Sequence, residues 1–297
     1  DAYAQAIDSD LDAFAKHVHA AHLPHALIAD CSASPLVAAQ YPTWLARGLH
    51  IVTPNKQAGS GPITRYREIQ HNARESGARF RYEATVGAGL PIISTLRDLI
   101  DTGDRIDRIE GMFSGTLAFL FNRFDGTQPF SELVREAKQL GYTEPDPRDD
   151  LDGKDVARKL VILARELGLS TELSDVEVDS LVPAELAAGS IDEFMARLPA
   201  LDAAMQAKLD GARANGEVLR FVASLDATGK ARVGLRALPK THAFANGKLT
   251  DNVVQFSTAR YNKNPLVVQG PGAGPEVTAA GVFADLLRVA AYLGARV

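Results

Sequence analysis

Hydrophobic and polar positions follow two different spacings along the first ninety residues. Short apolar runs predict buried strands, and apolar positions three or four residues apart predict helices. The strands are expected at 26–31, 50–53 and 79–86, and the helices at 11–21, 34–47 and 64–76. Strands that alternate with helices form a parallel sheet covered by helices. Ligands of such sheets bind beyond the carboxyl ends of the strands. We therefore expect the segments 30–32, 54–56 and 86–89 to meet at one edge.

After residue 89 the two patterns no longer alternate. Helices are expected at 91–101, from Ser114, from Ser131 to Gly141 and after Gly153, with Ser114 and Ser131 as N-terminal caps, and strands at 105–113, 252–257 and 265–269 with a hairpin turn at 226–229. This order is typical of an α+β domain with a mixed sheet. A last helix at 277–293 returns to the first domain. The sequence thus predicts an α/β chain of two domains, residues 1–88 with 275–297 and residues 89–274.

Composition narrows the class of protein. The chain has 297 residues, a formal net charge of −5 and a pI near 5.8, and it contains no basic tract, which argues against a nucleic-acid partner. No apolar run reaches the ~18 residues of a membrane span. The single cysteine, Cys31, excludes an internal disulfide and suits a reducing compartment such as the cytoplasm.

The segment 141–159 carries the densest charge in the chain. It contains five aspartates, one glutamate and four cationic residues, with two prolines that stiffen its first half. A calcium loop of the EF-hand type would need an acidic residue at positions 1 and 12 around a central glycine. With Gly153 as that glycine, these positions are Arg148 and Lys159, so the calcium interpretation fails.

Within this segment, Asp155 and Lys159 are i, i+4 neighbours on the helix that follows Gly153. On a helical wheel they border the apolar stripe, where partial burial makes the pKa of a lysine easy to shift. The alternative is an exposed ion pair worth only ~0.3–0.5 kcal/mol. Spacing alone does not decide between a partly buried pair and an exposed pair.

Glycine-rich turns are weaker signals. They occur at 59–61, 87–89 and 270–274, and none completes the G-x-G-x-x-G motif that binds a dinucleotide. Each is equally explained as a tight turn.

Taken together, five segments resemble homoserine dehydrogenase, most closely the version fused behind an aspartate kinase. They are Thr53–Lys56, Glu83–Pro91, Gly111–Thr116, 141–159 and Val277–Val282. The resemblance implies NAD- or NADP-dependent reduction of L-aspartate 4-semialdehyde to L-homoserine. It also implies that the protein forms a homodimer. It also implies that residues 1–88 are an incomplete Rossmann-type domain, beginning after the first strand and its glycine fingerprint, and that residues 89–274 bind substrate and dimerise.

The resemblance also assigns roles to residues. Lys159 would be the general acid and Asp155 its orienting partner. The small-molecule substrate would be held by Glu144, Asp150, Thr116 and Lys56, and the cofactor by Ser32, Ala33, Pro54, Lys56, Gly272 and Gly274. A monovalent cation, usually sodium, would lie among the backbone carbonyls of Glu83, Val86, Ala88 and Leu90. Aldehyde reduction needs a hydride from a cofactor and a proton donor at the oxygen, and the lysine–aspartate pair suits the second need.

The sequence departs from the family pattern in several places. Ala33 stands where a serine is frequent, and Gln57 where a second lysine is common. Because the glycine fingerprint is expected to precede the chain, we expect residues 1–297 alone to bind the nicotinamide cofactor poorly. The alternative function is a non-catalytic dimerisation module that retains amino-acid binding.

Overall fold

The computed structural model describes residues 9–20 and 22–296. It divides into two compact units, and each is described by itself. Unit 1 comprises residues 1–82 and 282–297, and unit 2 comprises residues 83–281.

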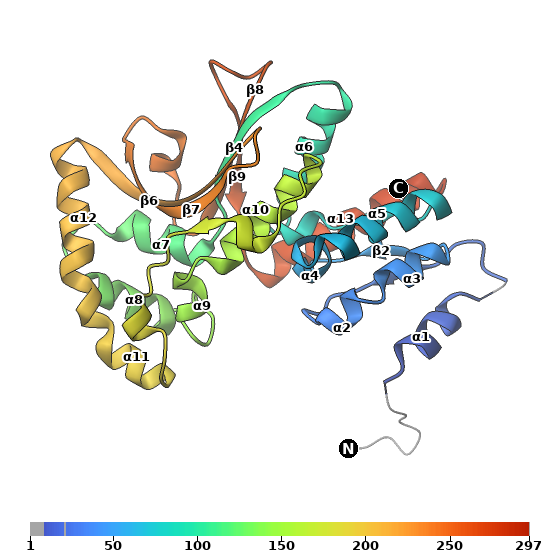
Figure 1. Cartoon of the computed structure of the whole chain (residues 1–297), viewed down its shortest axis with the longest axis horizontal. Helices are drawn as coiled ribbons and strands as arrows, with labels where there is room; N and C mark the ends of the chain where they lie inside the picture. The colour runs from blue at the N-terminus through green and yellow to red at the C-terminus, as the bar shows by residue number, and fades with distance from the viewer. Residues whose placement is uncertain (1–8, 21, 297) are drawn as a thin grey trace. The chain divides into compact units, whose positions relative to one another are not determined.

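Unit 1 is built on a parallel sheet with the strand order β1-β2-β3 (Figure 1). Its strands are β1 Leu27–Ala29, β2 His50–Val52 and β3 Phe80–Arg81, and its helices are α1 Leu11–Val18, α2 Pro35–Ala38, α3 Tyr41–Ala46, α4 Lys56–Ser60, α5 Ile63–Ser76 and the end of α13 Pro275–Tyr292. The central strand β2 is buried along its whole length, as expected for a parallel strand covered on both faces. The predicted parallel sheet with helices is confirmed.

The helix predicted at 34–47 is wrong in one respect, because the structure has two helices there, α2 and α3. Pro42 lies in the first turn of α3. Its nitrogen carries no hydrogen to donate to the carbonyl of Ala38, so one continuous helix cannot pass this position. Helix α1 ends at Val18, and its predicted end at Ala21 lies outside the described residues.

The strand predicted at 79–86 is too long. β3 ends at Arg81, and a 3₁₀ turn, Glu83–Thr85, follows. The Glu83 carboxylate accepts the backbone N–H groups of Ile93 at 2.7 Å and Ser94 at 2.9 Å. These donors open the next helix, so Glu83 fixes the turn to that helix instead of continuing the strand.

Unit 2 contains a six-stranded sheet with the order β5-β7-β6-β4-β8-β9. Its strands are β4 Ile106–Met112, β5 Glu177–Val178, β6 Glu217–Asp226, β7 Ala231–Pro239, β8 Asp251–Thr258 and β9 Leu266–Pro271, and its helices are α6 Ile92–Asp101, α7 Gly115–Arg123, α8 Phe130–Gln139, α9 Arg148–Leu151, α10 Lys154–Glu166, α11 Ile191–Arg197 and α12 Asp202–Ala214. β5 pairs with β7 in parallel and the other pairs are antiparallel. The predicted mixed sheet and its hairpin are therefore confirmed.

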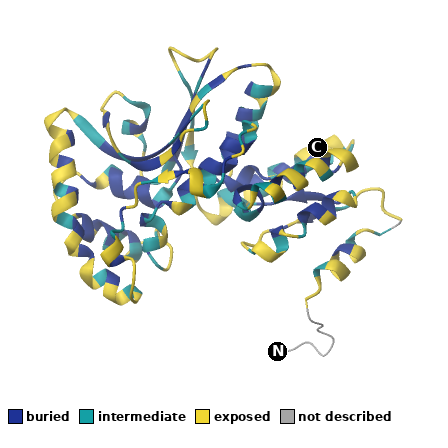
Figure 2. Ribbon diagram, in the orientation of Figure 1, coloured by how far each residue is buried: buried dark blue, intermediate teal, exposed yellow. Residues whose placement is uncertain are grey.

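The core of unit 2 lies between this sheet and helices α7, α10 and α12, which pack against its central strand β6 (Figures 1 and 2). Phe244 is fully buried there and joins a cluster with Met112, Val222 and Val253. Ser114 caps α7 by accepting the N–H of Leu117, as predicted.

The prediction that Ser131 is an N-terminal cap is wrong. α8 begins after Pro129, so Ser131 lies in the first turn of the helix. Its hydroxyl donates to the Asp202 carboxylate at 2.7 Å, a partner 71 residues away that local spacing cannot reveal.

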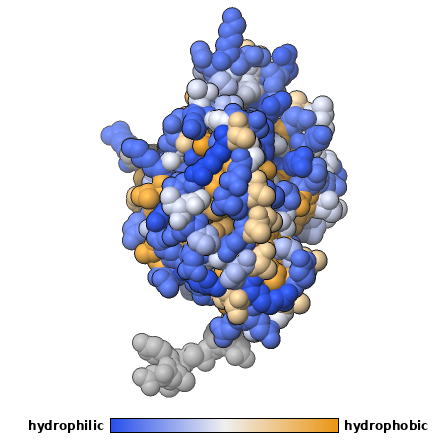
Figure 3. Space-filling view, turned by 90° about the vertical axis from the view of Figure 1, so that its left-hand side faces the viewer, coloured by the Kyte–Doolittle hydropathy of each residue, from blue (hydrophilic) through white to orange (hydrophobic). Residues whose placement is uncertain are grey.

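The face that carries α12 is largely hydrophilic (Figure 3). Within residues 9–20 and 22–296, no helix combines the length and apolar character needed to cross a membrane.

Candidate active site

Helix α10 positions the lysine–aspartate pair. Gly153 precedes it with φ +73°, and a Cβ atom there would lie 3.0 Å from the Phe221 ring. The positive φ favours glycine at this position, and the Phe221 ring would have to shift slightly to admit a side chain. The helix then buries its apolar stripe, including Val156 and Leu160, against unit 2, as its periodicity predicts.

Lys159 is held on two sides. Its Nζ lies 2.9 Å from Asp155 Oδ2 and donates to the backbone carbonyl of Phe113 at 2.6 Å. The lysine side chain is only 11 % exposed, whereas Asp155 is 40 % exposed. The alternative of an exposed ion pair is thus wrong for the lysine, whose ammonium is fixed at the end of β4 with its carboxylate partner open to solvent.

Asp150, on the short helix α9, lies in a second cluster. Its Oδ1 is 2.8 Å from the Thr116 hydroxyl, and its Oδ2 accepts the backbone N–H of Glu144 at 2.8 Å. Burial raises the pKa of Asp150 to about 6, and the nearby carboxylates of Glu144 and Asp155 add to this, while the two hydrogen bonds oppose it. Within residues 9–20 and 22–296, no salt bridge joins the Asp150 carboxyl to a cationic side chain.

The Thr116 hydroxyl has one hydrogen and two acceptors in reach. It lies 2.5 Å from the carbonyl of Tyr142 as well as 2.8 Å from Asp150. Both contacts are hydrogen bonds only if Asp150 carries a proton and donates it to Thr116. The geometry agrees with the direction in which the pKa of Asp150 is shifted.

Helices α7, α9 and α10 lie together in unit 2 and carry Thr116, Asp150 and Lys159 respectively (Figure 1). Glu144 enters this group through its backbone N–H, and its side chain is exposed. Lys56, the remaining residue expected at the substrate, belongs to unit 1, where it begins α4 after the cap Asn55.

The residues expected at the cofactor fall in both units. Ser32 and Ala33 are exposed after β1, and Pro54 follows β2, so these lie at the carboxyl edge of the parallel sheet. Gly272 and Gly274 belong to unit 2.

Packing accounts for Gly272 and backbone conformation accounts for Gly274, both in the turn at 270–274. A Cβ at Gly272 would lie 2.1 Å from Cγ of Asn252, and Gly274 has φ +118°. Among the described residues, Asn252 is fully buried with neither side-chain polar atom hydrogen-bonded, a feature that no sequence pattern predicts.

The segment expected to hold a monovalent cation, residues 83–90, has an unusual backbone. Gly87 and Ala88 have φ of +74° and +52°, and a positive φ is costly for alanine. Among the described residues, no group of three or more His, Cys, Asp or Glu side chains could hold a metal ion. Glu83 uses its carboxylate to bind the start of α6, and its backbone carbonyl, the atom expected at the cation, accepts the N–H of Val86 at 3.3 Å.

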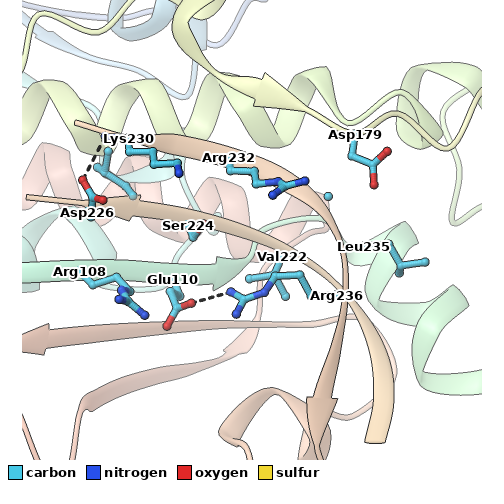
Figure 4. A pocket seen from close by; sticks show the side chains of 12 residues that line it. Arg108, Glu110, Asp179, Val222, Ser224, Asp226, Lys230, Arg232, Leu235 and Arg236 are labelled. Atoms are coloured by element: carbon cyan, nitrogen blue, oxygen red, sulfur yellow. Dashed lines mark hydrogen bonds and ion pairs between the residues drawn. The ribbon is translucent and has the colours of Figure 1, made fainter. Parts of the chain in front are cut away.

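A charged hollow of about 420 Å³ lies on strands β4, β6 and β7 (Figure 4). Arg108, Lys230, Arg232 and Arg236 line it together with Glu110, Asp179 and Asp226. Arg236 donates to Glu110 at 2.8 Å. No residue of the sequence-predicted site lies in it.

A parallel sheet with helices, which in other proteins binds nucleotides at its carboxyl edge, and a mixed-sheet unit that carries a lysine–aspartate pair together suit the dehydrogenase class. The comparisons agree. The family described as "Homoserine dehydrogenase" matches residues 91–287, and "Homoserine dehydrogenase, NAD binding domain" matches residues 1–83. The chain belongs to the homoserine dehydrogenase family.

Three relatives show the extent of the similarity. The chain is 53% identical to bifunctional aspartokinase/homoserine dehydrogenase 2, chloroplastic, of Zea mays over 98% of its own length and 32% of the relative. It is 50% identical to homoserine dehydrogenase of Emericella nidulans, over 89% of this chain and 75% of that one. A hyperthermophilic archaeal homoserine dehydrogenase in complex with NADPH superimposes with a TM-score of 0.67 at 26% identity, over 91% and 72% of the two chains. The chain thus spans about a third of the bifunctional relative.

Proposed function

We propose that this chain is the homoserine dehydrogenase part of an enzyme that interconverts L-aspartate 4-semialdehyde and L-homoserine with NAD or NADP. The observation that carries the proposal is the Lys159 cluster of unit 2, which lies in the same unit as the Asp150 cluster. In it, Asp155 and the Phe113 carbonyl hold the Lys159 ammonium. The non-catalytic alternative is less favoured, because the lysine–aspartate pair that the reaction would need is intact.

Lys159 is the proton donor at the reacting oxygen. Its ammonium keeps its orientation through Asp155 and Phe113, and it can protonate the oxygen of the aldehyde as that oxygen gains charge. A bound nicotinamide cofactor supplies the hydride. In the reverse direction, the neutral amine of Lys159 takes the proton from the alcohol.

Asp150 and Glu144 hold the ammonium of the amino-acid substrate. A partly buried carboxylate with a raised pKa ionises more readily when a cation comes near, and Asp150 is such a group. Thr116 keeps the Asp150 carboxyl in place through its hydroxyl. We assign Lys56 to the substrate from unit 1, as its family motif implies.

The residues at the carboxyl edge of unit 1 fit a nicotinamide nucleotide. Ser32 and Ala33 are exposed at the end of β1, and Pro54 and Lys56 follow β2, where parallel sheets bind ligands. Gly272 and Gly274 complete the proposed set. The archaeal relative with NADPH supports the cofactor class.

Four further properties belong to the proposal. The strained backbone at Ala88, next to Gly87 with its positive φ, supports a cation bound by carbonyls of residues 83–90. The mixed charges of the hollow on β4, β6 and β7 support a homodimer, because a patch with both signs can pair with its own copy across a twofold axis. The Zea mays relative supports fusion to an aspartokinase. The free Cys31 suits a reducing compartment, with the cytoplasm as our proposal.

The test is NADP-linked oxidation of L-homoserine by the complete natural protein, followed through absorbance of the reduced cofactor. Lys159→Ala should lower kcat by roughly 10²- to 10⁴-fold, the range for loss of a general acid or base. Lys154→Ala is the matched control, because Lys154 begins the same helix and pairs with Asp152 at 2.8 Å but is 65 % exposed. Equal kcat for both variants would remove Lys159 from the chemistry, and an inactive wild-type protein would refute the proposed function.

A further inference from the structure

Four side chains of unit 1 form a buried polar network where β1 and β2 end. They are Asp30, Tyr41, Thr53 and Asn55, whose exposed fractions are 6%, 0%, 1% and 3%. The sequence patterns placed Asp30 and Asn55 at this edge of the sheet and Thr53 in a family segment, but they assigned a role to none of the four. Burial of so many polar atoms is costly unless every one is hydrogen-bonded, so the arrangement of their partners is informative.

The Asp30 carboxylate is the centre of this network. Its Oδ2 accepts the Tyr41 hydroxyl at 2.5 Å and the Asn55 side-chain amide at 3.0 Å. Its Oδ1 accepts the backbone N–H of Ser32 at 2.8 Å. One carboxylate therefore ties the loop after β1 to the loop after β2.

Thr53 makes a second tie between the same two loops. Its hydroxyl donates to the Asp30 carbonyl at 2.7 Å and accepts the Asn55 backbone N–H at 2.9 Å. The Asn55 amide also donates to the Ser34 carbonyl at 3.0 Å, and its oxygen caps α4 by accepting the N–H of Gln57. These four contacts of Thr53 and Asn55 each fix backbone within residues 30–34 or 53–57.

We infer that Asp30 and Tyr41 are positioning residues, which hold the loops bearing Ser32, Ala33, Pro54 and Lys56 in the conformation that receives the nicotinamide end of the cofactor. This inference rests on the proposed function. Neither Asp30 nor Tyr41 needs to touch the cofactor, because Tyr41 is fully buried and acts through the carboxylate. Hydrogen bonds from Ser32, Tyr41 and Asn55 outweigh the effect of burial and lower the pKa of Asp30, so the carboxylate stays ionised and keeps all its donors across the working pH range.

The test is NADPH binding to the complete natural protein, followed by the fluorescence of the reduced nicotinamide ring. Tyr41→Phe removes one hydroxyl without changing the ring, and it should weaken NADPH binding about tenfold while the Kd for L-homoserine changes less than twofold. Thr53→Val, which removes the second tie at constant shape, should do the same. Tyr66→Phe is the matched control, since the Tyr66 hydroxyl meets that of Tyr82 at 3.3 Å in the same unit, and it should leave both Kd values unchanged.

Thermal unfolding of each variant separates positioning from stability. A purely structural role would lower the Tm of Tyr41→Phe but leave NADPH affinity intact at a temperature where the variant is folded, and that result would overturn the inference. Wild-type protein that binds no NADPH would overturn it as well. Wild-type protein that binds NADPH but does not oxidise homoserine would refute the proposed function alone.

Discussion

Replacement of Asp150 by asparagine should stabilise the chain at neutral pH while weakening the proposed substrate site. The structure favours a protonated Asp150, because only then do the contacts with Thr116 and Tyr142 both become hydrogen bonds. Asparagine imitates that state, since its amide can donate to the Thr116 hydroxyl and its oxygen can accept the Glu144 N–H. It carries no charge at any pH.

The magnitude follows from the pKa of Asp150, which burial raises from 3.8 to about 6. A tenfold change in a proton-binding constant corresponds to about 1.4 kcal/mol, so ionised Asp150 costs the folded chain up to about 3 kcal/mol. Between about pH 4 and pH 6 the folded state binds more protons than the unfolded state, so the stability of the wild type falls as pH rises through this window. The loss is complete above about pH 7.

The assay is urea unfolding of wild type and Asp150→Asn at several pH values between 4 and 8. The free energy of unfolding of Asp150→Asn should exceed that of the wild type by a margin that grows as pH rises and reaches up to about 3 kcal/mol at pH 8. Asp149→Asn is the control, because Asp149 is the exposed neighbour on the same helix and surface changes of this kind stay within about 0.5 kcal/mol. A difference between Asp150→Asn and wild type that does not vary with pH would refute the assignment of the raised pKa.

Two other predictions concern the segment 83–90. Gly281→Ala should lower the free energy of unfolding by about 1–3 kcal/mol, measured by urea unfolding, because the new Cβ would lie 3.0 Å from the Ala88 carbonyl oxygen. Gly211→Ala, a helix position with nothing within 4 Å, should instead raise it by up to about 1 kcal/mol, and equal effects would contradict the packing argument. Exchange of sodium and potassium for tetramethylammonium should lower both the Tm and the kcat of the complete protein, and no change in either would remove the proposed cation.

Local patterns predicted the parts of this molecule that depend on neighbours in sequence. The spacing of Asp155 and Lys159 fixed their pairing because a helix brings residues four apart together, and the alternation of strands and helices predicted the parallel sheet. Pro42 also marks the division of the predicted 34–47 helix, so the sequence contained the signal for two helices although one was predicted. The length of β3 was not, because the Glu83 carboxylate that ends it binds N–H groups ten and eleven residues later.

Long-range contacts explain what the sequence did not reveal about the candidate site. Lys159 donates to a carbonyl 46 residues away, and Thr116 meets Asp150 34 residues away. A motif can point to these residues as a group, but it cannot say which carboxylate is paired and which is left without a cation. That difference depends on burial and on the number of donors, which only the folded chain defines.

Asp30 and Asp150 show this difference most clearly. Both carboxylates lose water on folding, but Asp30 receives hydrogen bonds from Ser32, Tyr41 and Asn55 that outweigh burial and lower its pKa, whereas burial dominates at Asp150 and raises its pKa to about 6. A buried carboxylate that accepts hydrogen bonds on both oxygens, as Asp30 does, fixes the groups around it. An under-satisfied one lowers the stability of the empty protein, and a substrate ammonium would relieve that cost on binding. We therefore expect substitutions at Asp30 to change the conformation of the loops at 30–34 and 53–57. Substitutions at Asp150 should weaken substrate binding and stabilise the chain.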